Sequence, residues 1–137
     1  MAATMEATVT WRDGLVFDGQ SGTGHAVVMD GDKAVAASPM ELVLMAAGGC
    51  SSVDVVSILQ KARQQVAGVQ CHVKGGRADA IHAVFTTIHL HFLVRGTDLA
   101  EHQVERAVAL SADKYCSVAK MLEASVQITH SFAIETE

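Results

Sequence analysis

Residues 42–59 form the longest stretch of apolar and small side chains in the chain. Ser38, Pro39 and Glu41 precede it, with serine at the N-cap, proline at the first helical position and glutamate three residues after the cap. This arrangement is a capping box, which predicts that a helix begins at Pro39 and continues to about Gln65. Because its apolar residues lie on all sides, we expect the helix to be buried.

Shorter segments in which polar and apolar residues alternate lie on both sides of this helix and predict strands. Asp98 followed by Glu101 repeats the capping pattern and predicts a second helix, and residues 111–123 are expected to be helical as well. Helices that lie between antiparallel groups of strands predict an α+β fold with antiparallel sheets. The expected strands cover residues 7–11, 15–18, 25–30, 69–74, 84–95 and 126–135.

The long helix has nearly the length of a membrane span, but its polar residues argue against that interpretation. Asp54 lies in the middle of the segment, where a carboxylate would be costly within lipid, so we expect a core helix and no membrane partner. A chain of 137 residues fits a single domain, residues 1–137. So short a chain can hardly cover a wholly apolar helix alone, which favours an identical partner subunit.

Composition narrows the class of protein further. Half of the residues are hydrophobic and the net charge is −5, so the chain has ample material for a core and no basic stripe for nucleic acid. The N-terminal residues lack the charged-then-apolar pattern of a signal peptide. Three cysteines without a CxxC pair do not make a disulfide scaffold. We therefore expect a cytoplasmic protein with reduced thiols.

Cys50 is the first candidate for chemistry. Asp54 and Ser57 follow it at i+4 and i+7 and therefore share its helical face. Gly48 and Gly49 precede it, and glycine allows another backbone or a ligand to come close. The competing interpretation is a buried cysteine that packs as a small hydrophobic residue, which is common in proteins.

Cys116 is the second candidate. It follows Lys114 and is expected to begin a helical segment. A thiol at a helix N-terminus beside a lysine has a lowered pKa and is reactive. The alternative is a cysteine packed in the core at the boundary of an element. Cys71 lies within a predicted strand, and we assign it to packing.

The other polar residues point less directly to chemistry. Glu41 completes the capping box and can also face a site. His89 and His91 share a strand face at a spacing that suits a metal ion, but no third ligand lies close in sequence, so we expect no metal. Motifs that bind nucleotides or supply a serine nucleophile are absent from the sequence, and we expect no cofactor.

Two stretches, SPMELVLMAAGGCSSVDVVSILQK at residues 38–61 and ALSADKYCSVAKML at residues 109–122, resemble the OsmC/Ohr family of small thiol-dependent peroxidases. The resemblance extends over essentially the whole chain and is greatest to an uncharacterised cytoplasmic branch. It implies an OsmC-like fold and an intertwined homodimer, in which two long central helices pack inside antiparallel sheets.

The resemblance also implies roles for the two candidate cysteines. The family's cysteine at the position of Cys50 is peroxidatic: its thiolate attacks an organic hydroperoxide, releases an alcohol and becomes a sulfenic acid. The cysteine at the position of Cys116 resolves that sulfenic acid to a disulfide, which a dithiol such as a lipoyl protein reduces. Such sites lie at the subunit interface, in a pocket for small apolar substrates.

The chain departs from the peroxidase branches beside the expected site. Those branches place a glutamate directly after the helix-starting proline, where this chain has Met40, and Glu41 comes one residue later. They also stabilise the thiolate with an arginine from the segment before the helix, whereas residues 13–62 contain no arginine. His25 is the expected replacement, with Lys33 as the second choice.

The expected function is therefore the thiol-dependent reduction of organic hydroperoxides by a homodimer, with Cys50 as peroxidatic and Cys116 as resolving cysteine and Glu41 and His25 in support. Two alternatives stay open. One is a non-enzymatic protein of the same fold that binds a small apolar ligand, and the other is a thiol enzyme that acts on another electrophile. Sulfurs near bonding distance would favour redox chemistry, whereas widely separated sulfurs would favour binding.

Overall fold

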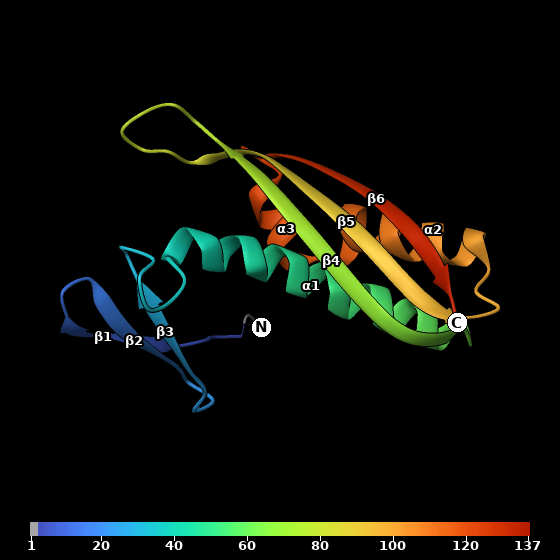
Figure 1. The fold of residues 1–137 in the computed structure, drawn as a ribbon, viewed down its shortest axis with the longest axis horizontal. Coiled ribbons are helices and arrows are strands. Elements are labelled where there is room, and N and C mark those ends of the chain that lie inside the picture. The colour runs from blue at the N-terminus through green and yellow to red at the C-terminus, as the bar shows by residue number, and fades with distance from the viewer. Residues whose placement is uncertain (1–2) are drawn as a thin grey trace. The chain divides into compact units, whose positions relative to one another are not determined.

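The structure is a computed structural model that describes residues 3–137. Residues 1–2, which the expected domain includes, lie outside the described residues. The chain divides into two compact units, Met1–Val43 and Leu44–Glu137, and each is considered by itself below (Figure 1).

Three strands make up the sheet of the first unit, in the order β1-β2-β3 with antiparallel neighbours. They are β1 (Ala7–Asp13), β2 (Val16–Ser21) and β3 (Ala26–Asp30). The strands expected at residues 7–11 and 15–18 are therefore confirmed and form an antiparallel hairpin, although both are longer than expected. Gly14 closes its turn with a φ of 51°, a conformation that glycine adopts without strain.

The long helix α1 (Pro39–Lys61) begins where the capping box predicts. The backbone N–H of Ser38 donates a 2.9 Å hydrogen bond to Glu41 Oε1, and the N–H of Glu41 donates one of 3.2 Å to Ser38 Oγ. Its end at Lys61 comes earlier than the expected Gln65. Arg63 has a φ of 60°, the left-handed conformation in which helices commonly stop.

The sheet of the second unit has the order β4-β5-β6. Its strands are β4 (Gln65–Arg77), β5 (Phe85–Thr97) and β6 (Gln127–Thr136). The expectation of purely antiparallel sheets is wrong for one pair, because β5 and β6 run parallel. Parallel neighbours need a crossover connection, and the helical segments α2 (Glu101–Leu110), η1 (Ser111–Tyr115) and α3 (Ser117–Leu122) supply it (Figure 1).

Two further boundaries differ from the sequence-based expectation. The strand expected to end at residue 74 continues through Gly75 as part of β4. A Cβ on that glycine would lie 2.7 Å from the Phe85 ring, so glycine is needed there because the strands pack closely. The expected capping residue Asp98 has a φ of 51° and does not cap a helix. Helix α2 begins at Glu101, and its N-cap residue Ala100 offers no side-chain hydrogen bond.

One face of the second sheet carries the core. Alternate residues of β5 are buried, as the sequence pattern predicts, and α1, α2 and α3 lie on one side of the sheet (Figure 1). Only one side of α1 is buried in the single chain, since Met45 and Val53 on its other side are 57% and 69% exposed. The largest fully buried side chains include Val55, Leu59, Ile88, Leu90, Phe92, Val94, Val104 and Val108.

Candidate thiol site

The approach of α1 to β4 positions Cys50. A Cβ on Gly48 would lie 2.6 Å from Val73 Cγ2 and 3.7 Å from Cys71 Sγ, so glycine at this position lets the helix pack closely on the strand. Successive helical residues are turned by about 100°, and Cys50 therefore points away from β4, towards η1 and α3. Its side chain is partly buried.

The turn between η1 and α3 holds Cys116, which is fully buried. Its backbone N–H donates a 2.8 Å hydrogen bond to the carbonyl of Ser111, and its Sγ accepts one of 3.3 Å from the N–H of Ala119. Ser111 Oγ in turn donates a buried 2.8 Å hydrogen bond to the carbonyl of Ser51 on α1. These contacts fix the Cys116 segment against the helix that carries Cys50.

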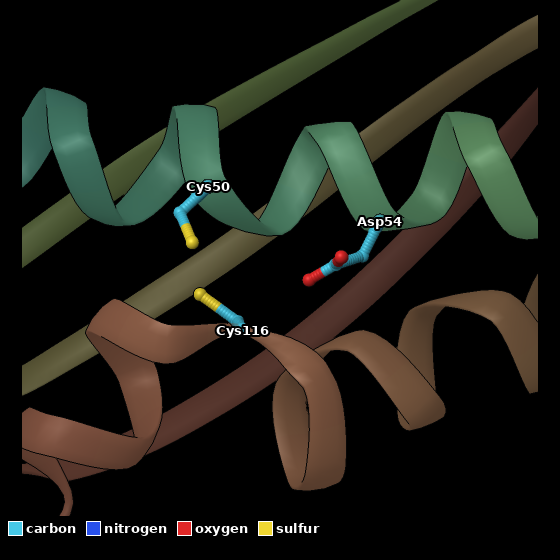
Figure 2. A group of neighbouring side chains, drawn as sticks. All are labelled: Cys50, Asp54 and Cys116. Carbon is cyan, nitrogen blue, oxygen red and sulfur yellow. The ribbon is translucent and has the colours of Figure 1, made fainter. Parts of the chain in front are cut away.

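Cys50, Cys116 and Asp54 come together in one cluster, although the two cysteines are 66 positions apart in the sequence. The two Sγ atoms and a carboxylate oxygen of Asp54 all lie within 4.8 Å of one another. Figure 2 shows the two sulfurs facing each other across the gap between α1 and the turn, with Asp54 one helical turn along α1. The cluster is therefore formed by side chains from two separate segments of the second unit.

Burial governs the protonation of Cys116. It raises the pKa of this thiol, and the neighbouring Cys50 adds to the increase, while the N–H of Ala119 and the nearby Ser51 hydroxyl lower the pKa by less. The expected helix start at Cys116 is confirmed, but the expected lowering of its pKa is wrong, because burial outweighs the effect of the helix terminus. The Lys114 ammonium lies 5.4 Å from the centre of the Tyr115 ring.

Two polar atoms beside the sulfurs have no hydrogen-bond partner among residues 3–137. They are Asp54 Oδ2 and Ser51 Oγ, and both atoms are buried. Ser51 Oγ lies near the Cys116 sulfur without forming a hydrogen bond of ordinary geometry. A buried polar atom without a hydrogen-bond partner destabilises the folded protein. A bound proton or cation at this cluster would supply the missing partner of the Asp54 carboxylate.

Cys71 lies on β4 and faces Gly48 of α1. Burial raises the pKa of its thiol to about 11, and the Ser52 hydroxyl opposes this shift. At neutral pH this cysteine is therefore a protonated, partly buried side chain, in keeping with its assignment to packing.

The two supporting residues expected from the sequence belong to the first unit. Glu41 caps α1, and the N–H of Ser38 lowers the pKa of its carboxyl group. His25 is exposed directly before β3, with Nδ1 3.0 Å from Thr23 Oγ1. Their support of a thiolate stays a prediction.

His89 and His91 lie on the second sheet, on the face opposite the buried residues of β5. Both nitrogens of His89 form hydrogen bonds to hydroxyl groups of β6, at 2.6 Å to Thr129 and 2.8 Å to Ser131. The Nδ1 atom of His91 also lies 2.7 Å from Ser131 Oγ. The pair thus joins β5 to β6 across the sheet.

An open cavity of about 530 Å³ adjoins the cluster at Asp54. Apolar side chains of α1, α2 and η1 form part of its wall, together with two cations. Sequence reasoning noted the i+4 spacing of Asp54 from Cys50 but did not identify it as a site residue, and nothing in the sequence indicated that Arg106 and Tyr115 would lie nearby. The lining consists of Asp54, Ser57, Ile58, Lys61, Ala62, Arg106, Leu110 and Tyr115.

The chain is similar to several known proteins. Protein YhfA of Escherichia coli is 54% identical over 131 residues, which cover 95% of this chain and 98% of that protein. The crystal structure of a hypothetical protein from Aquifex aeolicus matches with a TM-score of 0.90 and 29% identity over 99% of each chain. The organic hydroperoxide resistance protein OhrB of Bacillus subtilis shares the fold, with a TM-score of 0.63, 14% identity and coverage of 96% and 98%.

The chain also matches the model of a protein family. The model described as OsmC-like protein matches residues 30–131, a range that includes α1, both cysteines of the cluster and the first half of β6. This chain therefore belongs to the OsmC-like protein family.

Proposed function

We propose that this chain is a thiol-dependent redox protein that reduces organic hydroperoxides through Cys50 and Cys116. The observation that carries the proposal is the separation of at most 4.8 Å between their sulfurs. A disulfide has an S–S bond of about 2.05 Å, so the sulfurs need to approach by at most about 3 Å. Membership of the OsmC-like family supports a role in redox chemistry or peroxide resistance.

The proposed reaction begins at Cys50. Its thiolate attacks the terminal peroxide oxygen, the O–O bond breaks, and the departing alkoxide takes a proton and leaves as the alcohol. Cys116 then loses its proton and attacks the Cys50 sulfenic acid, forming the S–S bond and releasing water. An external dithiol, for instance a lipoyl group, reduces this disulfide and is itself oxidised to a disulfide.

The cavity at Asp54 offers an approach for the substrate. Ile58, Leu110 and Tyr115 supply apolar surface to its wall, which suits the organic part of a hydroperoxide. Asp54 belongs to both the cavity and the cysteine cluster, so a molecule in the cavity would lie beside the reacting sulfurs.

A homodimer is part of the same proposal. Met45 and Val53 project from the uncovered side of α1, next to a mainly apolar groove on that helix. We propose that α1 of a second copy covers this surface. The groove is lined by Gly49, Ser52, Val53, Val56, Ser57 and Gln60.

We place the dimer in the cytoplasm, where thiols are kept reduced. Helix α1 has a mean hydropathy of 1.9 over its most apolar window and the length of a membrane span. Its partly buried Asp54 and the soluble character of OsmC-like proteins instead support a core helix.

Stopped-flow consumption of cumene hydroperoxide tests the redox proposal. The wild type and Cys71→Ser, the matched control, should consume peroxide in repeated turnovers with a dithiol reductant. Cys50→Ser should lose this activity. Cys116→Ser should complete the first step only and accumulate a sulfenic acid that dimedone traps. Equal rates for wild type and Cys50→Ser would rule the proposal out.

A non-enzymatic binding protein is the second candidate, and the cavity of about 530 Å³ is the observation that favours it. In that case acyl compounds should raise the melting temperature of the wild type and of a Cys50→Ser/Cys116→Ser double variant by the same amount. The absence of any such shift, together with no ligand in a native extract, would exclude it.

A further inference from the structure

The Cys50–Asp54–Cys116 cluster combines the ligand types that zinc prefers. Thiolate sulfur and carboxylate oxygen both bind Zn²⁺, and three protein ligands with one open position form a common type of zinc site. The three ligand atoms come from two segments that are already fixed to each other by the buried hydrogen bond between Ser111 Oγ and the Ser51 carbonyl. Little reorganisation is therefore needed to gather them.

The distances within the cluster fit such a site. Zn–S bonds of about 2.3 Å and Zn–O bonds of about 2.0–2.2 Å place tetrahedral ligands about 3.6–3.8 Å apart. The three ligand atoms lie within 4.8 Å of one another, so each separation would shorten by about 1 Å at most. Rotation of the partly buried Cys50 and Asp54 side chains can supply this change, while Cys116 is held in place by the N–H of Ala119.

A second observation points to a cation. Asp54 Oδ2 is buried without a hydrogen bond, and Asp54 forms no ion pair with any side chain of residues 3–137. A carboxylate oxygen withdrawn from water needs a compensating positive charge or donor. A divalent ion between this oxygen and the two sulfurs would provide that charge at the point where the side chains converge.

We propose that the reduced protein binds one Zn²⁺ ion through Cys50 Sγ, Cys116 Sγ and the carboxylate of Asp54, with a water or an exogenous group in the fourth position. Binding converts two thiols to thiolates and releases two protons, without any change of oxidation state. The inference uses the same sulfurs as the proposed redox function, but it does not require that the protein reduce peroxides.

Zinc binding and disulfide formation exclude each other, because the thiolate electron pairs that bind the metal are those that form the S–S bond. The metal would hold the cysteines in a protected, reduced form, and their oxidation would expel it. The sequence-based expectation of no metal considered the spacing of His89 and His91. It did not consider this cluster, whose members are brought together only by the fold.

Cobalt(II) added to the reduced protein under anaerobic conditions is a direct probe, since a tetrahedral thiolate site gives a near-ultraviolet sulfur-to-metal band and visible d–d bands. The wild type and Cys71→Ser should show both. Cys50→Ser and Cys116→Ser should each lose about half of the near-ultraviolet intensity, because one of two Co–S bonds is removed. Asp54→Asn should keep that band but bind at least about tenfold more weakly. Zn²⁺ should displace the cobalt in each case.

The disulfide form of the wild type controls for misfolded variants, because it has the same sequence and should bind no cobalt at this site. A wild type without the sulfur-to-cobalt band would overturn the inference, as would a band of undiminished intensity in Cys50→Ser or a band that disappears in Cys71→Ser. Cobalt binding without peroxide consumption would leave the inference standing and remove the proposed redox function. Peroxide consumption without cobalt binding would do the reverse.

Discussion

Burial sets the chemistry of Cys116. A raised pKa keeps its thiol protonated at neutral pH, which suits a resolving cysteine better than a primary nucleophile. In the proposed mechanism, this thiol stays protonated in the core and reacts only after the neighbouring sulfur has been oxidised to an electrophile. Cys50, which is partly exposed, is the better placed of the two to meet an incoming molecule first.

The pKa of Cys71 predicts a pH dependence of stability in the reduced protein. The folded state raises this pKa to about 11, so it favours the protonated thiol. The corresponding stability is fully present below the unfolded pKa of about 8.5 and is lost as pH rises towards 11. Relative to Cys71→Ser, the free energy of unfolding should fall by about 1–2 kcal/mol between pH 8 and pH 11, after allowance for partial exposure.

Urea denaturation of both proteins with a phosphine reductant measures this difference. Cys71→Ser is a suitable reference because its hydroxyl does not titrate in this range, while the other titrating groups are shared. A difference between the two proteins that stays constant with pH would contradict the prediction.

The residues of the cluster show which parts of the site could be predicted from the sequence. The role proposed for Cys50 and its pairing with Cys116 were expected from the resemblance of two motifs, and the structure brings both sulfurs within 4.8 Å of each other. Asp54 could be placed on the helical face of Cys50, but its proximity to Cys116 could not be foreseen. The spacing of residues along one helix indicates which of them share a face. Which other segment of the chain packs against that face depends on the path of the crossover from β5 to β6.

At the scale of elements, Glu41 in the first turn of α1 has one observed role and one proposed role. Glu41 accepts a hydrogen bond from the N–H of Ser38 and thereby caps the helix. The resemblance also suggests that it supports the thiolate. The two roles can be separated because glutamine fits a capping box as well as glutamate does.

We expect Ser38→Ala to lower the free energy of unfolding by about 1 kcal/mol through loss of the N-cap. Glu41→Gln should leave stability nearly unchanged, because its amide oxygen still accepts the Ser38 N–H. If Glu41 acts only as a cap, Glu41→Gln should retain peroxide consumption, and if it supports Cys50, the rate should fall without a change in melting temperature. Denaturation curves and initial rates on the same samples decide between these outcomes.

The sequence predicts the boundary of an element well where a local motif marks it. It predicts the boundary poorly where pairing with another strand determines it. The capping box placed the start of α1 correctly. Residues 62–65 are compatible with a helix by composition, but the chain turns at Ala62 and Arg63, and Gln65 already pairs with Thr97 of β5 as the first residue of β4. Likewise, Gly75 has the character of a turn residue, yet the nearby Phe85 ring explains why glycine occurs inside a strand.

For the whole molecule, the most notable feature is the apolar surface that α1 exposes on its uncovered side. The sequence predicted a helix apolar on all sides, and the second unit covers only one of them. Large exposed apolar surfaces are typical of protein interfaces, and an identical subunit accounts for the surface with the fewest assumptions.

We therefore expect Val53→Lys to shift the protein from dimer to monomer in light scattering coupled to size exclusion. A lysine there would place a charge within the apolar contact between two copies of α1. Met121→Lys is the matched control, since Met121 on α3 is 71% exposed and Val53 is 69% exposed. A wild-type monomer, or a Val53→Lys variant that stays dimeric, would count against the proposed assembly.

The separation of 66 positions between Cys50 and Cys116 gives their bond a mechanical consequence. An S–S link would close a ring that contains β4, β5 and α2, and cross-linking so long a segment restricts the unfolded chain by about 4 kcal/mol in the loop-entropy model. Each catalytic cycle would then form and break a cross-link that spans most of the second unit. Resistance to heat would report the redox state of the protein.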